Sequence, residues 1–193
     1  SMEQQAEGNS SKDNYLRYNK LEKGKPANFA LLEEDPASWW LVWGDPVEGG
    51  NGQPFRFISQ PTQADIDEEL GANYTQSLNF DKNGPRKPVE CLTWPIYNWD
   101  SSLVQVLEVS HVSLGRQFIK YGLNRKYSKN LLGWDFELSK IQADMTRYEL
   151  LIVPRDDEEH SDEKMDAAWE KVQEKGFDLQ QLLVGKDPFN PAS

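Results

Sequence analysis

The sequence predicts a mainly β protein with one or two helices, arranged as a partly open five-stranded barrel with a disordered acidic C-terminal tail. Short runs of aromatic and β-branched residues recur between turns rich in Gly, Pro and Asn over residues 27–153. Helical spacing occurs at residues 62–70 and 111–121, and a brief, transient helix is expected at residues 167–175 of the tail. After Pro154 the chain becomes strongly acidic, a composition typical of segments that do not pack a core.

Three strands are expected in the first third of the chain. Residues 27–32 form an apolar run, residues 39–43 are aromatic and β-branched, and residues 54–58 resume the pattern after a Gly-rich turn. Neighbouring side chains of a strand point to opposite faces, so Trp39 and Trp40 face opposite sides. At least one of these two rings is therefore expected at a surface.

The clearest local pattern is a β-hairpin formed by residues 89–99 and 103–109. Both runs are rich in aromatic and β-branched residues, and the Asn-Trp-Asp-Ser-Ser sequence where they meet favours a turn. Because side chains alternate along a strand, Tyr97 and Trp99 share one face. Trp94 points to the other face and is expected inside.

One helix and two further strands complete the folded region. Ser110 is expected to cap a helix over residues 111–121, which Gly122 ends. Residues 134–141 and 146–153 form the last two strands. The sequence shows no internal repeat and no strand–helix alternation that would require a parallel sheet. The simplest closed arrangement of these short strands is a small barrel of the oligonucleotide-binding (OB) type.

Length and charge divide the chain into three parts: a disordered N-terminus (residues 1–14), one folded domain (residues 15–154) and an acidic, mostly disordered tail (residues 155–193). The net charge is −11, and residues 154–193 alone carry 11 acidic and 5 basic side chains. The single cysteine, Cys91, allows no intramolecular disulfide and is typical of a cytoplasmic protein. We expect no membrane span, because no apolar run is long enough.

From Val109 to Trp134 this acidic protein has no acidic residue. Cations and aromatic rings alternate there, and this mixture suits the phosphates and stacked bases of a single strand. A solvated helix face is the plainer alternative. The expected phosphate contacts are Arg116, Lys120, Arg125, Lys126 and Lys129, with help from Arg86, Lys87 and Arg147, and the expected stacking rings are among Trp40, Tyr97, Trp99, Tyr121 and Tyr127.

Motifs for enzyme chemistry are missing from the sequence. The two histidines, His111 and His160, have no partners at metal-ligand spacing, and neither a phosphate-binding Gly-rich loop nor a nucleophile motif occurs. We therefore expect no catalytic activity, no metal and no cofactor. Two alternatives remain: an acidic inhibitor or adaptor that presents residues 39–43 and the tail to a protein, or a metal-dependent nuclease built on Asp135 and Glu137.

Four motifs follow one another along the chain. A Trp-x-x-Tyr-Asn hairpin begins at Trp94, and a Trp-Asp-Phe strand begins at Trp134. A Thr-Arg-Tyr strand begins at Thr146 and ends in Pro, and an Asp-Pro-Phe motif closes the tail. This order, which spans nearly the whole ordered chain, resembles that of the single-stranded DNA-binding proteins of tailed bacteriophages and prophages.

The resemblance implies an OB barrel that coats single-stranded DNA, largely independently of sequence, during phage replication or recombination in the host cytoplasm. It also implies that the tail recruits phage or host replication proteins through Asp187, Pro188 and Phe189. Two positions depart from the family pattern: residues 190–193 follow the Phe, and Val112-Ser113 replaces a common Lys-Ser. The anionic tail is further expected to occupy the binding groove until a single strand displaces it.

Overall fold

The structure, a computed structural model, describes residues 13–46, 52–71, 87–142 and 147–191. The N-terminus predicted to be disordered lies outside the described residues except for Asp13 and Asn14. Arg86, one of the predicted phosphate contacts, also lies outside them.

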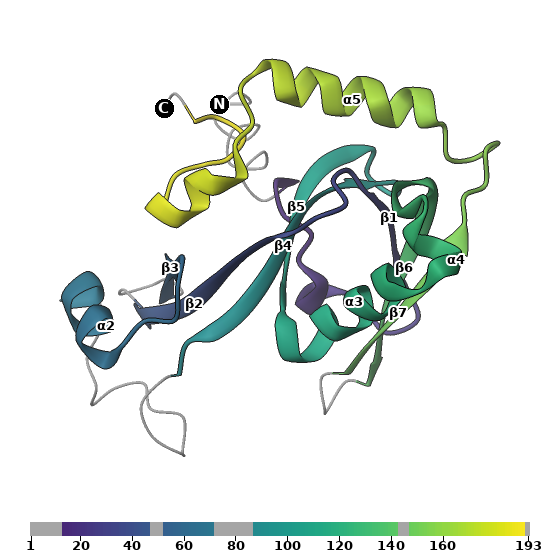
Figure 1. Ribbon diagram of the computed structural model, residues 1–193. Helices are drawn as coiled ribbons and strands as arrows, with labels where there is room; N and C mark the ends of the chain where they lie inside the picture. The colour runs from purple at the N-terminus through teal and green to yellow at the C-terminus, as the bar shows by residue number, and fades with distance from the viewer. Residues whose placement is uncertain (1–12, 47–51, 72–86, 143–146, 192–193) are drawn as a thin grey trace.

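Seven antiparallel strands form one open, curled sheet (Figure 1), so the prediction of a mainly β protein is confirmed. The sheet has the order β3-β2-β4-β1-β6-β7, and β5 pairs with the other edge of β4. Each strand lies within three residues of its predicted bounds, and all seven join one sheet. The strands are β1 (Ala27–Leu31), β2 (Ala37–Pro46), β3 (Gly52–Phe57), β4 (Val89–Asn98), β5 (Leu103–Ser110), β6 (Trp134–Gln142) and β7 (Arg147–Pro154).

Strand β4 is the centre of the sheet because it pairs with three other strands. Its first half pairs with β2, its last three residues pair with β1, and β5 runs along its whole opposite edge. Alternate side chains of β4 and β5, among them Trp94, Ile96 and Leu107, enter the main core with Phe29 of β1. The predicted hairpin and the predicted inward position of Trp94 are both confirmed.

Helix α2 (Gln63–Leu70) covers the β2–β3 end of the sheet, where Ile66 and Leu70 pack on Val42. The side chain of Thr62 accepts a hydrogen bond from the backbone of Asp65, and the Asp65 carboxylate accepts one from the backbone of Thr62. This reciprocal cap is the reason why so short a helix has a defined start.

Helix α3 (Arg116–Leu123) covers the opening between β5 and β7, which do not pair with each other within the described residues. The Gln117 amide donates to the carbonyl oxygen of Tyr148 at 3.0 Å and accepts from the amide of Leu150 at 2.8 Å. The Tyr121 hydroxyl donates to the carbonyl oxygen of Leu150 at 2.8 Å. Two side chains of a helix thus satisfy the free edge of β7 as a neighbouring strand would.

The helical region after β5 differs from the single capped helix that the sequence predicts. A π-helical turn, η3 (His111–Gly115), precedes α3, and the Ser110 side chain makes no cap hydrogen bond. A Cβ atom on Gly115 would lie 2.8 Å from the Ser110 carbonyl oxygen, so the turn folds tightly onto the end of β5. Three short elements were not predicted: η1 (Tyr18–Lys20), α4 (Arg125–Ser128) and η4 (Leu131–Gly133).

The prediction of a mostly disordered tail is wrong for residues 155–191. This part of the chain forms α5 (Asp162–Glu174) and η5 (Leu179–Val184), which pack on the outer face of the sheet, with α5 lying across β5 in Figure 1. Met165 of α5 is buried against Tyr97 and its neighbours, and η5 covers Trp39 and Cys91. The few apolar residues of the tail are spaced so that they face the sheet. The overall acidic composition of the tail does not indicate this spacing.

No helix in the described part of the chain combines the length and the apolar character needed to cross a membrane.

We expect Gln117→Ala to lower the free energy of unfolding by about 1–3 kcal/mol, because it leaves an amide and a carbonyl of β7 without partners in a partly buried place. The measurement is urea-induced unfolding. Gln173→Ala, in which an exposed glutamine of α5 is lost, serves as the control and should unfold like the wild type. Equal stability of the two variants would contradict the role assigned to Gln117.

Candidate nucleic-acid interface

The five cations of the acid-free window lie on two neighbouring helices and the residue that follows them. All five side chains are exposed, and α3 and α4 contact each other. None of the five takes part in an ion pair among the described residues. We call this area the α3–α4 cationic surface; it consists of Arg116, Lys120, Arg125, Lys126 and Lys129.

The aromatic rings of the window are built into that surface edge to face. Tyr121 and Tyr127 are half-buried with ring centroids 5.7 Å apart, and Tyr127 contacts Trp134 at 4.8 Å. The planes of both pairs are nearly perpendicular. The Lys126 ammonium lies 5.6 Å from the centroid of Tyr127. Tyr121 and Tyr127 also pack against the main core, so they support the two helices there.

Tyr97 and Trp99 share one face as predicted, but the C-terminal segment covers that face. Tyr97 is buried in the cluster beneath Met165. The Trp99 ring stacks on His160 with centroids 4.4 Å apart and planes 2° from parallel, and the Arg155 guanidinium lies 5.5 Å from it. The expectation that these two rings are open for base stacking is therefore wrong for this conformation.

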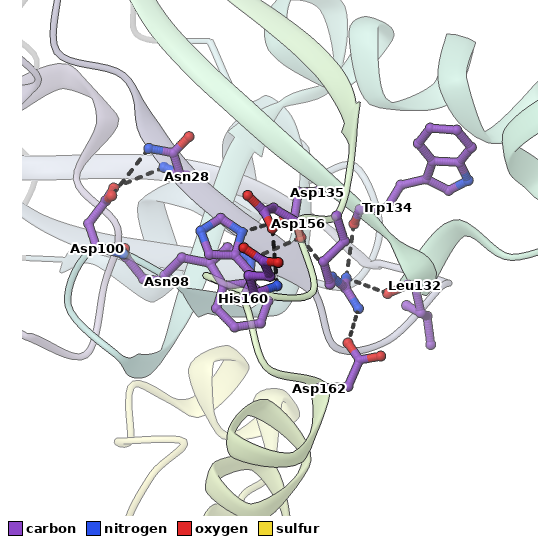
Figure 2. Close-up of polar contacts among 12 residues, drawn as sticks. Asn28, Asn98, Asp100, Leu132, Trp134, Asp135, Asp156, His160 and Asp162 are labelled. Atoms are coloured by element: carbon purple, nitrogen blue, oxygen red, sulfur yellow. Dashed lines mark hydrogen bonds and ion pairs between the residues drawn. The ribbon is translucent and has the colours of Figure 1, made fainter.

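A buried carboxylate, Asp135, organises the start of the C-terminal segment (Figure 2). One of its oxygens accepts from Trp99 Nε1 at 2.9 Å and from Arg155 Nε at 2.8 Å, and the other lies 2.6 Å from His160 Nδ1. Arg155 also binds Asp162 at 2.7 Å. The network joins the turn after β4, strand β6 and the residues that lead into α5. Loss of one partner would leave the buried Asp135 carboxylate without compensation, which is strongly destabilising.

The same network argues against a nuclease site at Asp135 and Glu137. Both Asp135 oxygens are occupied by donors, and the neighbouring Arg155 supplies the positive charge that a metal ion would otherwise supply. Among the described residues, no group of three His, Cys, Asp or Glu side chains could hold a metal ion. The residues present at Asp135 therefore do not fit a metal.

The remaining predicted contacts are spread over other strands. Trp40 is half-buried on β2, opposite the buried Trp39, as strand alternation predicts. Lys87 is exposed just before β4, and Arg147 is exposed at the start of β7. Neither Trp40 nor Lys87 lies on the α3–α4 cationic surface.

The Asp-Pro-Phe motif is folded back onto the protein. Pro188 is buried, and the Phe189 ring packs on Phe177 with centroids 5.0 Å apart. Asp187 is exposed, and its side chain accepts a hydrogen bond from the Phe189 amide at 2.9 Å. The prediction that all three residues are displayed to a partner is wrong for Pro188 and Phe189, because their apolar groups are needed in the packing under α5 and η5.

An open groove with a volume of about 970 Å³ lies between the N-terminal segment, the β2–β3 hairpin, β5 and η5. We call it the Trp43 groove. Its floor includes Leu41, Cys91 and Val106, and Trp43 is exposed in its wall. In the sequence, the basic composition of residues 15–25 is the feature that could have indicated this groove. The other walls come from segments that lie far from residues 15–25 in the chain. Its charged and aromatic lining residues include Tyr15, Arg17, Tyr18, Lys20, Trp43, Arg56, Glu108, Lys186 and Asp187.

An ion pair crosses the floor of this groove. Arg56 of β3 donates to Glu108 of β5 through Nε at 2.8 Å and through a terminal nitrogen at 3.0 Å, and Trp39 Nε1 donates to the same carboxylate at 2.6 Å. Burial alone would lower the pKa of the Arg56 guanidinium, but the hydrogen bonds and charge of Glu108 raise it above its ordinary value. Arg56 and Glu108 therefore offset each other's charge within the groove.

Comparisons with family models, curated proteins and solved structures found no match for this chain.

Cys91 reports on the packing of η5, because it is 3% exposed in the cluster that Leu179 and Leu182 complete. Burial, with the nearby charge of Glu108, raises the pKa of its thiol from 9.0 to about 12. At pH 8 we expect native Cys91 to react with iodoacetamide at least about 100-fold more slowly than in urea, because the thiolate is the reactive form. Mass spectrometry of the digested protein measures the rate.

The control for this reaction is Ser59→Cys, which places an exposed thiol in the same molecule, just after β3, and should react readily. Reaction of native Cys91 at a rate close to that of the thiol at position 59 would contradict the packing of η5 on the sheet.

Proposed function

We propose that this protein binds single-stranded DNA largely independently of sequence, with the α3–α4 cationic surface against the phosphates, during phage replication or recombination. One observation carries the proposal: five exposed cations without ion pairs among the described residues gather on adjacent helices of a protein whose net charge is −11. Local positive potential of this kind, and not net charge, supplies sequence-independent binding to a polyanion.

The topology is consistent with this function. We propose that the curled antiparallel sheet is a version of the OB barrel, in which α3 and the N-terminal segment cover the opening between β5 and β7. In support, Tyr18 contacts Tyr148 of β7 with centroids 5.0 Å apart, and the backbone of Leu16 donates to Val106 of β5. OB barrels commonly present a cationic groove with rings to single strands.

The alternative function, that of an inhibitor or adaptor, requires residues 39–43 and the tail to be presented to a protein partner. Most of these groups are not available for such a contact. Trp39 and Pro188 are buried, and Phe189 packs on Phe177. Five exposed cations would also have no use in a module that acts through acidic residues. Sequence-independent binding of a polyanion accounts for more of the surface.

The regulatory part of the proposal concerns the acidic run Asp156–Glu159. All four side chains are exposed, and the run follows Arg155, which binds the carbonyl oxygens of Leu132 and Trp134. The Trp134 ring in turn contacts Tyr127 of α4. The run thus begins beside the α3–α4 cationic surface, and we propose that it competes with phosphates there while α5 and η5 stay packed.

Recruitment of phage or host replication proteins is proposed for the exposed acidic side chains of α5, since the terminal motif is folded back. These side chains are Asp162, Glu163, Asp166, Glu170 and Glu174.

The first test removes two cations of the binding surface in Arg116→Ala/Lys120→Ala. We expect weaker binding of fluorescein-labelled oligo-dT at low salt, measured by anisotropy. The slope of log affinity against log salt should become shallower by about 1.4, since each phosphate contact to a single strand contributes about 0.7. The control Lys171→Ala/Lys175→Ala removes two exposed cations of the C-terminal segment and should leave the slope unchanged. Absence of oligo-dT binding by the wild type would overturn the proposed function.

The second test replaces the acidic run by amides, in Asp156→Asn/Asp157→Asn/Glu158→Gln/Glu159→Gln. We expect affinity for oligo-dT to rise several-fold at low salt and the gain to fade near 0.1 M salt, where the screening length is about 10 Å. The control neutralises four carboxylates of α5, in Glu163→Gln/Asp166→Asn/Glu170→Gln/Glu174→Gln. Equal tightening by both variants would show a general effect of net charge and contradict local competition.

A further inference from the structure

We propose that the Trp43 groove is a second binding site for the single strand, which receives bases, with η5 in place as one of its walls. This inference rests on the proposed function and adds a surface that the acid-free window does not include. The C-terminal segment then has a second role besides competing with phosphates. It helps to form the groove, because Leu182, Gly185, Lys186 and Asp187 are among the lining residues.

The shape of the groove suits an extended ligand. Its volume of about 970 Å³ is at the upper end of the range for ligand sites, and its walls come from four separate parts of the chain. The floor is formed by packed strands, where Leu41 and Val106 are buried. A floor of packed strands with an open top can hold flat rings.

The aromatic content of the groove suits nucleobases. Trp43 is 49% exposed in the wall formed by β2, and its cross-strand neighbour on β3 is Pro54. Tyr15 and Tyr18 line the groove from the N-terminal segment and are half-buried. Every base has a flat face, so stacking on such rings favours single strands without selecting a sequence.

The charges around the groove favour a polyanion over an acidic or neutral peptide. Arg17, Lys20 and Lys186 are exposed in its lining, and Asp187 is the exposed acidic residue among the lining residues. Glu108 in the floor is neutralised by Arg56. The groove is therefore locally positive in a protein that is negative as a whole, which fits phosphates beside the stacked bases.

The groove and the α3–α4 cationic surface are joined by one stretch of chain. Val109 and Ser110 line the groove at the end of β5, and η3 and α3 follow directly. Single strands occupy about 4–16 nucleotides per OB barrel, and we propose that one strand contacts both surfaces.

The experiment measures the affinity of the full chain for oligo-dT at low salt by anisotropy. Trp43→Ala should weaken binding about 5- to 150-fold, the loss of one stacked base, whereas Trp43→Phe keeps a ring and should retain most of the affinity. Arg17→Ala/Lys20→Ala should weaken binding and lower the salt slope, while Lys23→Ala/Lys25→Ala, which removes exposed cations of the same segment outside the groove lining, should not. Thermal unfolding confirms that each variant is folded.

The outcomes separate this inference from the proposed function. If the wild type binds oligo-dT and both Trp43→Ala and Arg17→Ala/Lys20→Ala bind as tightly, the groove is not a binding site and the proposed function stands. If the groove variants lose affinity while Arg116→Ala/Lys120→Ala does not, the groove holds the strand and the α3–α4 cationic surface does not. If the wild type does not bind oligo-dT, both proposals fail.

Discussion

Strand β4 is buried on both faces, and this burial dictates that other segments pack on both sides of it. Its residues from Cys91 to Asn98 are all buried, so both sides of the sheet require cover. The main core covers one side, and α5 and η5 cover the other. The C-terminal segment is consequently part of the fold, because without it the faces of Tyr97 and Trp39 would meet water.

An acidic segment can serve as such a cover because its two kinds of residue face opposite ways. Met165, Leu179 and Leu182 are buried against the sheet, whereas the carboxylates of α5 are exposed. Asp135 and Arg155 add a buried ion pair where the segment leaves β7, so its direction is set before α5 begins. The carboxylates of α5 therefore remain exposed to solvent on the side of the segment that faces away from the sheet.

This arrangement separates the charges of the protein in space. The α3–α4 cationic surface and the Trp43 groove carry exposed cations, and the acidic run and α5 carry exposed carboxylates. For a polyanionic ligand, such a molecule would be repulsive at long range and attractive over two restricted areas. Salt acts on such binding in two opposing ways, because screening removes the long-range repulsion and also weakens the local attraction.

Local sequence patterns were enough to predict the positions of the strands, the β4–β5 hairpin, a helix at residues 62–70 and the inward position of Trp94, because these features depend on residues close together in the chain. They also located the cations of the α3–α4 surface, since they lie within one short window. The tertiary structure alone decided what covers Tyr97 and Trp99, how Gln117 completes the edge of β7, and where the Trp43 groove lies. Each of these features brings together segments that are far apart in the chain. Local composition does not predict which distant segments come into contact.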